Sequence, residues 1–149
     1  MSGVADPDNL QRFVAAQSSV YGEVCRELAE GRKRTHWMWF IFPQLKGLGQ
    51  SATAQHFGIG SLREARAYLA HPVLGPRLRD CTALLRDFGE DRPISAILGS
   101  VDALKLRSSM TLFERASVDD ADRALFGAVL DRYYGGEPDQ RTLAPLSGD

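Results

Sequence analysis

The chain has 149 residues, of which 44% are hydrophobic and 25% charged, as in a globular domain and unlike a disordered or fibrous chain. Eighteen Lys and Arg residues nearly balance 19 Asp and Glu residues, so the net charge of −1 speaks against a nucleic-acid-binding protein. No apolar run approaches the roughly 18 residues that a membrane-spanning helix needs, and the N-terminus lacks the basic start and apolar core of a signal peptide. We therefore expect a cytoplasmic protein with no membrane partner. Its predicted parts are a flexible lead over residues 1–9, one domain over residues 10–146 and a tail over residues 147–149.

The first predicted helix covers about residues 10–30. Apolar residues recur there at the three- and four-residue spacing of a helix with one buried face. Asp8 or Asn9 can cap its start, and Gly31 is placed to end it. The three basic residues 32–34 then lie near the negative end of the helix dipole, which is a more ordinary role for them than binding nucleic acid.

The next segment, residues 37–42, consists of large apolar side chains. It has the composition of a strand, but it does not alternate with polar residues and the chain offers no second strand to pair with it. We therefore predict a short buried helical turn that runs into Pro43.

Five more helices are predicted after this turn. Ser61 and Glu64 form a capping box that opens a helix ending near residue 70. Further helices are predicted over residues 72–88, 93–98, 100–115 and 118–134, the last with a cap at Ser117 and Asp120. Residues 139–146 are expected to pack back on the domain through Leu143 and Leu146. The predicted fold is one all-α domain of about six or seven helices.

The segment with the clearest indication of function follows the first helix. It contains both tryptophans of the chain, preceded by a histidine and followed by a lysine in a glycine-bearing loop. Backbone N–H groups and a cation together can capture an anion or a phosphate. The alternative is that the aromatic residues fill the core and the glycines make turns; the glycine orders of a Walker loop and of a dinucleotide-binding fingerprint are both absent. The candidate ligand-binding residues are Trp37, Trp39, Gln44, Lys46, Gly47, Gly49 and Ser51.

A second polar cluster consists of Lys105, Ser108, Ser109 and Thr111, of which the first three would share one face of a helix. A desolvated lysine beside hydroxyl groups can activate a nucleophile. The alternative is a solvated helix face with hydroxyl groups bonded back to backbone carbonyls. His36, next to Trp37, can act as a base, as a stacking group or as a structural residue. These four residues, Lys105, Ser108, Ser109 and His36, are the catalytic candidates, and whether the protein is an enzyme stays open.

The cysteine and histidine residues do not suggest a metal site. Cys25 and Cys81 fall on apolar helix faces, so we expect buried free thiols rather than a disulfide scaffold. The three histidines are scattered and lack metal-ligand spacing. We therefore predict no metal and no cofactor.

The segment from His36 to Gln44, with Gly47-Leu48-Gly49 and Ser51 after it, resembles the hallmark of a bacterial family, the domain-of-unknown-function family 1810. Further matching segments lie at residues 64–78, 102–113 and 136–143. The resemblance implies a small all-α domain and no established activity. Some members carry the label calpastatin, which does not suit a packed domain because calpain inhibitors of that kind are disordered. The chain is also remotely similar in size and helical content to NADAR domains, from which no active-site residue can be carried over.

Two hypotheses about function follow. The first is that the protein binds or processes a phosphorylated or nucleotide-like small molecule, an anion, in a cleft where the two polar clusters meet. The alternative is a non-enzymatic protein-interaction module, for which an exposed tryptophan on a flat surface would be typical.

Overall fold

The computed structural model describes residues 5–146, and within them it contains ten α-helices and no β-strand. In chain order the helices are α1 (Gln11–Ser18), α2 (Tyr21–Glu30), α3 (Met38–Ile41), α4 (Ala52–His56), α5 (Leu62–Ala70), α6 (Leu74–Arg86), α7 (Ile94–Leu98), α8 (Ser100–Ala116), α9 (Asp120–Tyr134) and α10 (Gln140–Leu146). The predicted all-α class is confirmed. Within this part of the chain no helix is both long and apolar enough to cross a membrane.

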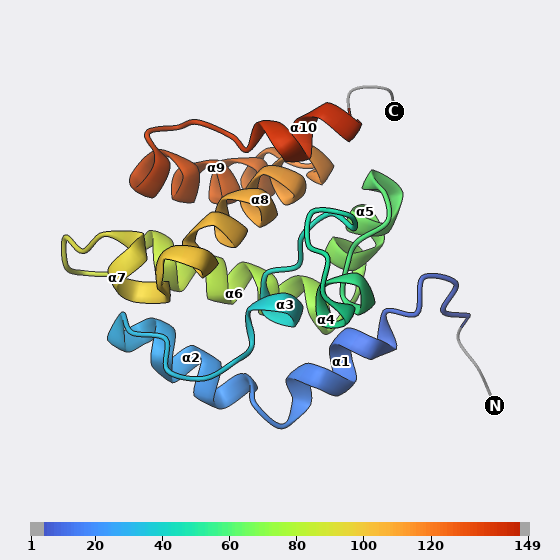
Figure 1. Cartoon of the computed structure of the whole chain (residues 1–149), viewed down its shortest axis with the longest axis horizontal. Coiled ribbons are helices and arrows are strands. Elements are labelled where there is room, and N and C mark those ends of the chain that lie inside the picture. Colours follow the sequence, from blue (N-terminus) through green and yellow to red (C-terminus); the bar gives the residue numbers. More distant parts are fainter. Residues whose placement is uncertain (1–4, 147–149) are drawn as a thin grey trace.

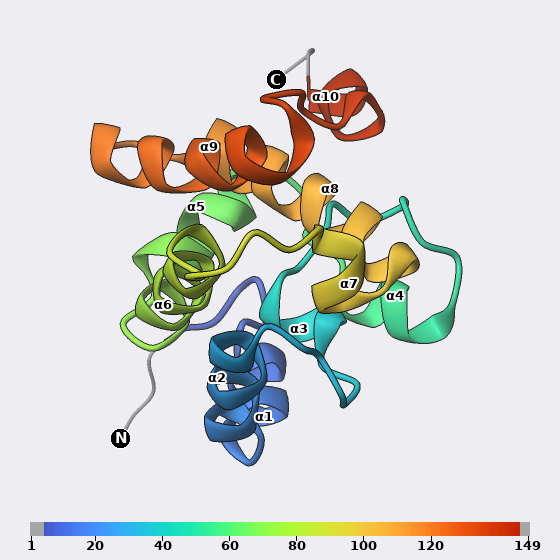
Figure 2. The same ribbon diagram turned by 90° about the vertical axis from the view of Figure 1, so that its left-hand side faces the viewer.

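The helices form layers around α8. Figures 1 and 2 show α1 and α2 along one side of the molecule, α6 in the middle and α9 with α10 on the opposite side. Helix α8 packs against α5, α7, α9 and α10. It buries Leu106, Met110, Leu112 and Phe113 almost completely. Such all-round burial is expected for the central helix of a domain.

The predicted number of six or seven helices is too low, in part because the first predicted helix is two helices. Helix α1 ends at Ser18, and Val20 leaves the helical conformation with φ −121° and ψ −8° before α2 begins. The Ser18 hydroxyl donates to the carbonyl oxygen of Val14 at 2.7 Å. Hydroxyl groups that bond back to the helix, followed by a β-branched residue, favour such a break. The apolar periodicity continues across the break, so the sequence pattern alone does not reveal it.

The short helices α4 and α10 are the other two helices that the predicted number did not include. Helix α4 has five residues and no buried one, so it lacks the apolar periodicity that predicts a helix. Helix α10 covers most of the segment that was expected to pack back on the domain, and it buries Leu146 while Leu143 stays half-buried. The turn predicted within residues 37–42 is confirmed as α3.

Of the caps predicted for the helices that begin after Ser61 and after Ser117, one is confirmed and one is wrong. The Ser61 hydroxyl accepts a hydrogen bond from the N–H of Glu64, as the capping box predicts. The predicted cap of α9 at Ser117 is wrong, because its hydroxyl donates to the carbonyl of Phe113 at the end of α8. Asp119 caps α9 instead, accepting from the N–H of Asp122 at 2.8 Å. A carboxylate is well suited to that position, at the positive end of the helix dipole.

The predicted lead falls partly outside the described residues, and the predicted tail over residues 147–149 falls outside them entirely. Within the described part of the lead, Asp6 accepts hydrogen bonds from the N–H groups of Leu10 and Gln11 at the start of α1. These two bonds lower the pKa of Asp6, with a smaller opposing effect of burial.

Candidate functional site

The loop that carries the tryptophans is held by a buried glutamate of α2. The carboxylate of Glu27 accepts hydrogen bonds from the N–H groups of Arg34 and Thr35, at 2.7 and 3.0 Å, and from the Thr35 hydroxyl at 2.7 Å. It also accepts from the indole Nε1 of Trp37 at 3.0 Å. Burial opposes ionisation of Glu27, but the hydrogen bonds together outweigh it and lower the pKa to about 2. Glu27 therefore fixes the path of the chain from α2 to α3.

The two tryptophans lie in different environments. Trp37 is 1% exposed and contacts Phe42 in the core, with ring centroids 6.2 Å apart. Trp39 is half-buried, and the ammonium group of Lys105 lies 4.5 Å from the centroid of its ring. Neither indole is fully exposed to solvent, and both hypotheses about function stay predictions.

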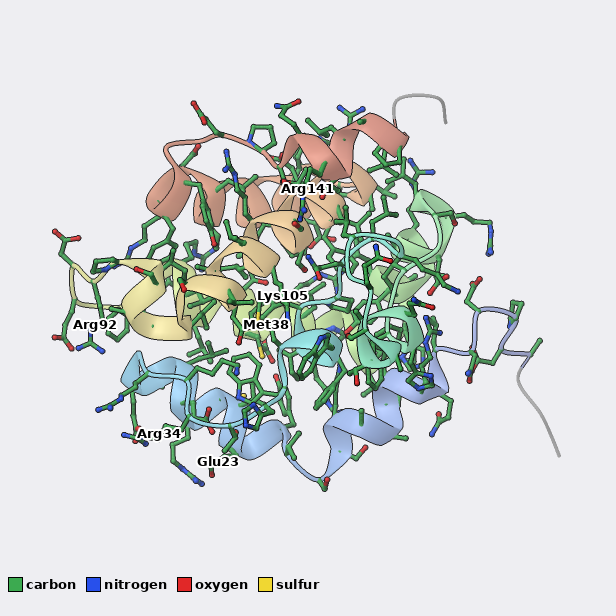
Figure 3. All side chains as sticks on the ribbon, viewed as in Figure 1. Glu23, Arg34, Met38, Arg92, Lys105 and Arg141 are labelled. Carbon is green, nitrogen blue, oxygen red and sulfur yellow. The ribbon has the colours of Figure 1, made fainter. Side chains whose placement is uncertain are left out.

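The side chain of Lys105 connects α8 to α3 through its contact with Trp39. Lys33, in the loop after α2, lies near Lys105 because both contact Asp102. The Nζ of Lys33 lies 3.0 Å from one oxygen of Asp102, and the Nζ of Lys105 lies 3.6 Å from the other. Lys33 also lies over the Trp37 ring, 5.1 Å from its centroid. We call Lys33, Trp37, Trp39, Asp102 and Lys105 the lysine–tryptophan cluster. Figure 3 labels Lys105 of α8 and Met38, the first residue of α3, which are drawn next to each other in that view.

The two serines predicted to act with Lys105 have other surroundings. Ser108 donates to the carboxylate of Asp139 at 2.8 Å, and Thr142 donates to the same oxygen at 2.5 Å, so this network ties α8 to α10. The Ser109 hydroxyl is buried and has no hydrogen-bond partner within residues 5–146. No hydrogen bond among those residues joins Lys105 to either serine, and a catalytic role for Lys105, Ser108 and Ser109 stays a prediction.

The loop after α3 is shaped mainly by backbone contacts. The N–H of Lys46 donates to the carbonyl of Ile59 at 2.7 Å, and the N–H of Ile59 donates to the carbonyl of Gln44 at 2.9 Å. These bonds make an isolated parallel bridge between Leu45 and Ile59. Gly47 follows with φ +102°, a conformation that few other residues adopt. Gln44 therefore takes part in the backbone bridge, and Gly47 allows the turn that follows it.

Gly49 and Ser51 also serve the local fold. A Cβ atom on Gly49 would lie 2.6 Å from the Cβ of Ala54, so the loop packs closely on α4. The Ser51 hydroxyl caps α4 by accepting from the N–H of Ala54 at 3.1 Å. These contacts agree with the alternative reading of the loop as a set of turns, and a binding role for its residues stays a prediction.

Lys46 lines a polar hollow and is not part of the lysine–tryptophan cluster. Its exposed side chain lines a polar hollow of about 390 Å³ together with Arg12, His56 and Glu64. Arg12 is already engaged there, because it forms an ion pair with Glu64 at 3.0 Å and donates to the backbone carbonyl of His56 at 2.8 Å. No residue of the lysine–tryptophan cluster is among the described residues that line this hollow.

His36 and His71 lie in different environments, and the proposed role of His36 stays a prediction. His36 is exposed, directly before the Trp37 that Glu27 holds. The Nδ1 of His71 accepts hydrogen bonds from the N–H groups of Val73 and Leu74, which is a cap at the start of α6. Within the described part of the chain, no group of three or more His, Cys, Asp and Glu residues could hold a metal ion.

A groove between α2 and α6 was not predicted. It encloses about 820 Å³, and its walls include Tyr21, Cys25, Leu84 and Phe88. Figures 1 and 2 show α2 and α6 lying next to each other. Each of the two helices carries a cysteine on the face that packs against the other helix. The apolar residues on both faces are the only feature of the sequence that could have predicted the groove.

Comparison with known proteins identifies the family. The profile described as "Protein of unknown function (DUF1810)" matches residues 7–146. A search of curated proteins found no match. The crystal structure of the conserved hypothetical protein Rv1873 from Mycobacterium tuberculosis is 56% identical in sequence, with a TM-score of 0.91 over 95% of this chain and 99% of that one. Neither finding supports the remote similarity to NADAR domains. From its sequence pattern and its structure alike, the chain belongs to the DUF1810 family.

Proposed function

We propose that the protein binds a small anionic ligand with a planar, nucleotide-like part at the lysine–tryptophan cluster. The observation that carries the proposal is the charge of the cluster: the two ammonium groups of Lys33 and Lys105 share the single carboxylate of Asp102. One positive charge is therefore not compensated within the cluster. An anion is the ligand that such a site favours.

Partial burial strengthens the attraction. The side chains of Lys33 and Lys105 are 9% and 22% exposed, and that of Asp102 is 18% exposed. Charges interact more strongly where water is partly excluded. The contact of Lys105 with Asp102 is the longer of the two, at 3.6 Å, so a phosphate oxygen can approach Lys105 without breaking the 3.0 Å contact of Lys33.

The indole of Trp39 supports the second half of the proposal. It is half-buried, and one part of the ring is held by the cation of Lys105. An indole of this kind offers a stacking surface for a base or another planar group. The ligand class is therefore a phosphorylated or nucleotide-like molecule, and no reaction is assigned to the site.

The test is a thermal-shift screen with nucleotides, NAD, ADP-ribose and sugar phosphates. A ligand present at about 100 times its Kd adds about 2.7 kcal/mol to the free energy of unfolding, which raises Tm measurably. We expect at least one anionic compound to raise Tm, and Lys105→Ala and Trp39→Ala to abolish that shift. Lys46→Ala is the matched control, since it removes one lysine charge elsewhere and should leave the shift unchanged.

Two results would contradict the proposal. If no compound in the panel raises Tm of the wild-type protein, the cluster is a structural clamp between α3 and α8. If Lys46→Ala abolishes the shift while Lys105→Ala preserves it, the ligand binds in the polar hollow instead. Circular dichroism of each variant shows that a lost shift does not reflect a lost fold.

A further inference from the structure

The groove between α2 and α6 holds the two cysteines of the chain in one place. Cys25 of α2 and Cys81 of α6 are close enough to influence each other's ionisation, at the place where the two helices pack together. Both are free thiols. The two cysteines are 56 positions apart in the sequence and are brought together only by the fold, so their proximity is a tertiary feature.

The two thiols differ in how accessible they are to a reagent in solution. Cys25 is half-buried and lines the groove of about 820 Å³, whereas Cys81 is completely buried behind it. A small reagent in the groove therefore reaches the sulfur of Cys25 first. An accessible thiol with a second thiol behind it is the arrangement of an attacking and a resolving cysteine.

The surroundings favour the thiolate on Cys25 over that on Cys81. The hydrogen bond with Cys81 lowers the pKa of Cys25, and burial opposes this effect. The same hydrogen bond, together with burial, raises the pKa of Cys81. The neighbouring Asp80 raises the pKa of both thiols, and Arg77 lowers that of Cys25.

Tyr21 adds a hydrogen-bond donor to this corner of the groove. Its hydroxyl is buried and has no hydrogen-bond partner at normal distance within residues 5–146. Burial, followed by the nearby Cys81, raises its pKa, so the O–H group stays protonated at neutral pH. The sulfur of Cys25, with which this hydroxyl interacts, is a weak acceptor, and an oxygen atom added to that sulfur would be a stronger one.

We propose that Cys25 and Cys81 are a redox-active pair that hydrogen peroxide converts into a disulfide between α2 and α6. The thiolate of Cys25 attacks one oxygen of the peroxide; the S–O bond forms, the O–O bond breaks, and hydroxide leaves. Cys25 is thereby oxidised to sulfenic acid and the peroxide is reduced. The Cys81 sulfur then attacks that of Cys25; the S–S bond forms, the S–O bond breaks, and water leaves with the proton of the Cys81 thiol. Two thiols and one peroxide give one disulfide and two waters.

The experiment treats the folded full-length chain with hydrogen peroxide, blocks remaining thiols, and maps the peptides by mass spectrometry without reduction. We expect a peptide pair joined through Cys25 and Cys81, which reduction separates. In Cys81→Ser, Cys25 should remain as sulfenic acid and react with dimedone. In Cys25→Ser, Cys81 should resist both peroxide and iodoacetamide until the chain is unfolded. Circular dichroism of the two variants confirms that they keep their helices.

Three results would overturn the proposal. One is a wild-type chain in which peroxide leaves both thiols free. Another is accumulation of sulfenic or sulfinic acid on wild-type Cys25 with Cys81 still reduced, since Cys81 would then be too far away or too rigid to resolve it. The third is equal reactivity of Cys81 in Cys25→Ser and of Cys25 in Cys81→Ser toward iodoacetamide in the folded state. None of these outcomes depends on the ligand site at α3 and α8.

Discussion

Replacement of Glu27 by glutamine tests the claim that a buried carboxylate organises the tryptophan loop. Glu27 is completely buried and accepts four hydrogen bonds from Arg34, Thr35 and Trp37. Its pKa falls from 4.5 to about 2. Because each pKa unit corresponds to about 1.4 kcal/mol, ionised Glu27 contributes about 3 kcal/mol to the free energy of unfolding at neutral pH.

The sign of the pH dependence follows from this lowered pKa. The contribution is fully present above the unfolded-state pKa near 4.5, and it is lost as the pH falls toward about 2. Glu27→Gln keeps the shape of the side chain and one acceptor oxygen, but it removes the charge. The variant should therefore be less stable than the wild type by about 3 kcal/mol at pH 7, and the two should converge near pH 2.

Urea unfolding of both proteins between pH 2 and pH 7 measures this difference. The control is Glu23→Gln on the same helix, because the Glu23 side chain is 42% exposed and pairs with Arg26 on the surface. That variant should lose less than about 1 kcal/mol. The reasoning fails if Glu27→Gln is as stable as Glu23→Gln at pH 7, or if its deficit does not shrink as the pH falls.

Two further predictions concern packing, and the same unfolding assay checks both. Gly75→Ala should cost at least about 2 kcal/mol, because its Cβ would lie 2.1 Å from a backbone carbonyl oxygen of α5. Gly22→Ala should instead add about 0.5 kcal/mol, since nothing lies within 4 Å of its added Cβ; equal effects of the two alanines would refute this argument. Arg79→Ala should cost about 2 kcal/mol, because Arg79 holds the buried Asp122 through bonds of 2.7 and 2.9 Å and joins α6 to α9. Arg123→Ala, whose ion-pair partner is fully exposed, should change stability by less than about 0.5 kcal/mol, and a similar loss for both arginines would contradict the assigned role of burial.

Most of the fold follows from patterns within short segments. The capping box at Ser61, the ending of α2 at Gly31 and the buried turn of α3 are all local features, and each was predicted. The break between α1 and α2 was not predicted, because the helical spacing of apolar residues continues unchanged across residues 19 and 20. Helix α4 was missed since a short exposed helix buries no apolar face that a periodicity could reveal.

The candidate site depends on contacts between distant segments, which patterns within short segments do not predict. The segment with both tryptophans and the helix with Lys105 could each be singled out, but the contact of Lys105 with Trp39 belongs to the packing of α8 on α3. Glu27 looked like one of many helix-surface carboxylates, although it is the residue that collects the donors of the loop. Ser108 faces Asp139 of the chain before α10, a partner 31 residues away that no spacing rule indicates.

Local chemistry along the chain was thus sufficient to specify an all-α domain, most of its helix boundaries and the two segments that contain the candidate site residues. These properties depend on interactions between residues that are at most a few positions apart, such as caps, turns and the spacing of apolar side chains. The partners of Glu27, the shared Asp102 and the meeting of Cys25 with Cys81 were decided by the packing of helices that are distant in sequence. Burial and charge pairing are properties of that packed arrangement, and the chemistry of each site therefore depends on neighbours that the tertiary structure supplies.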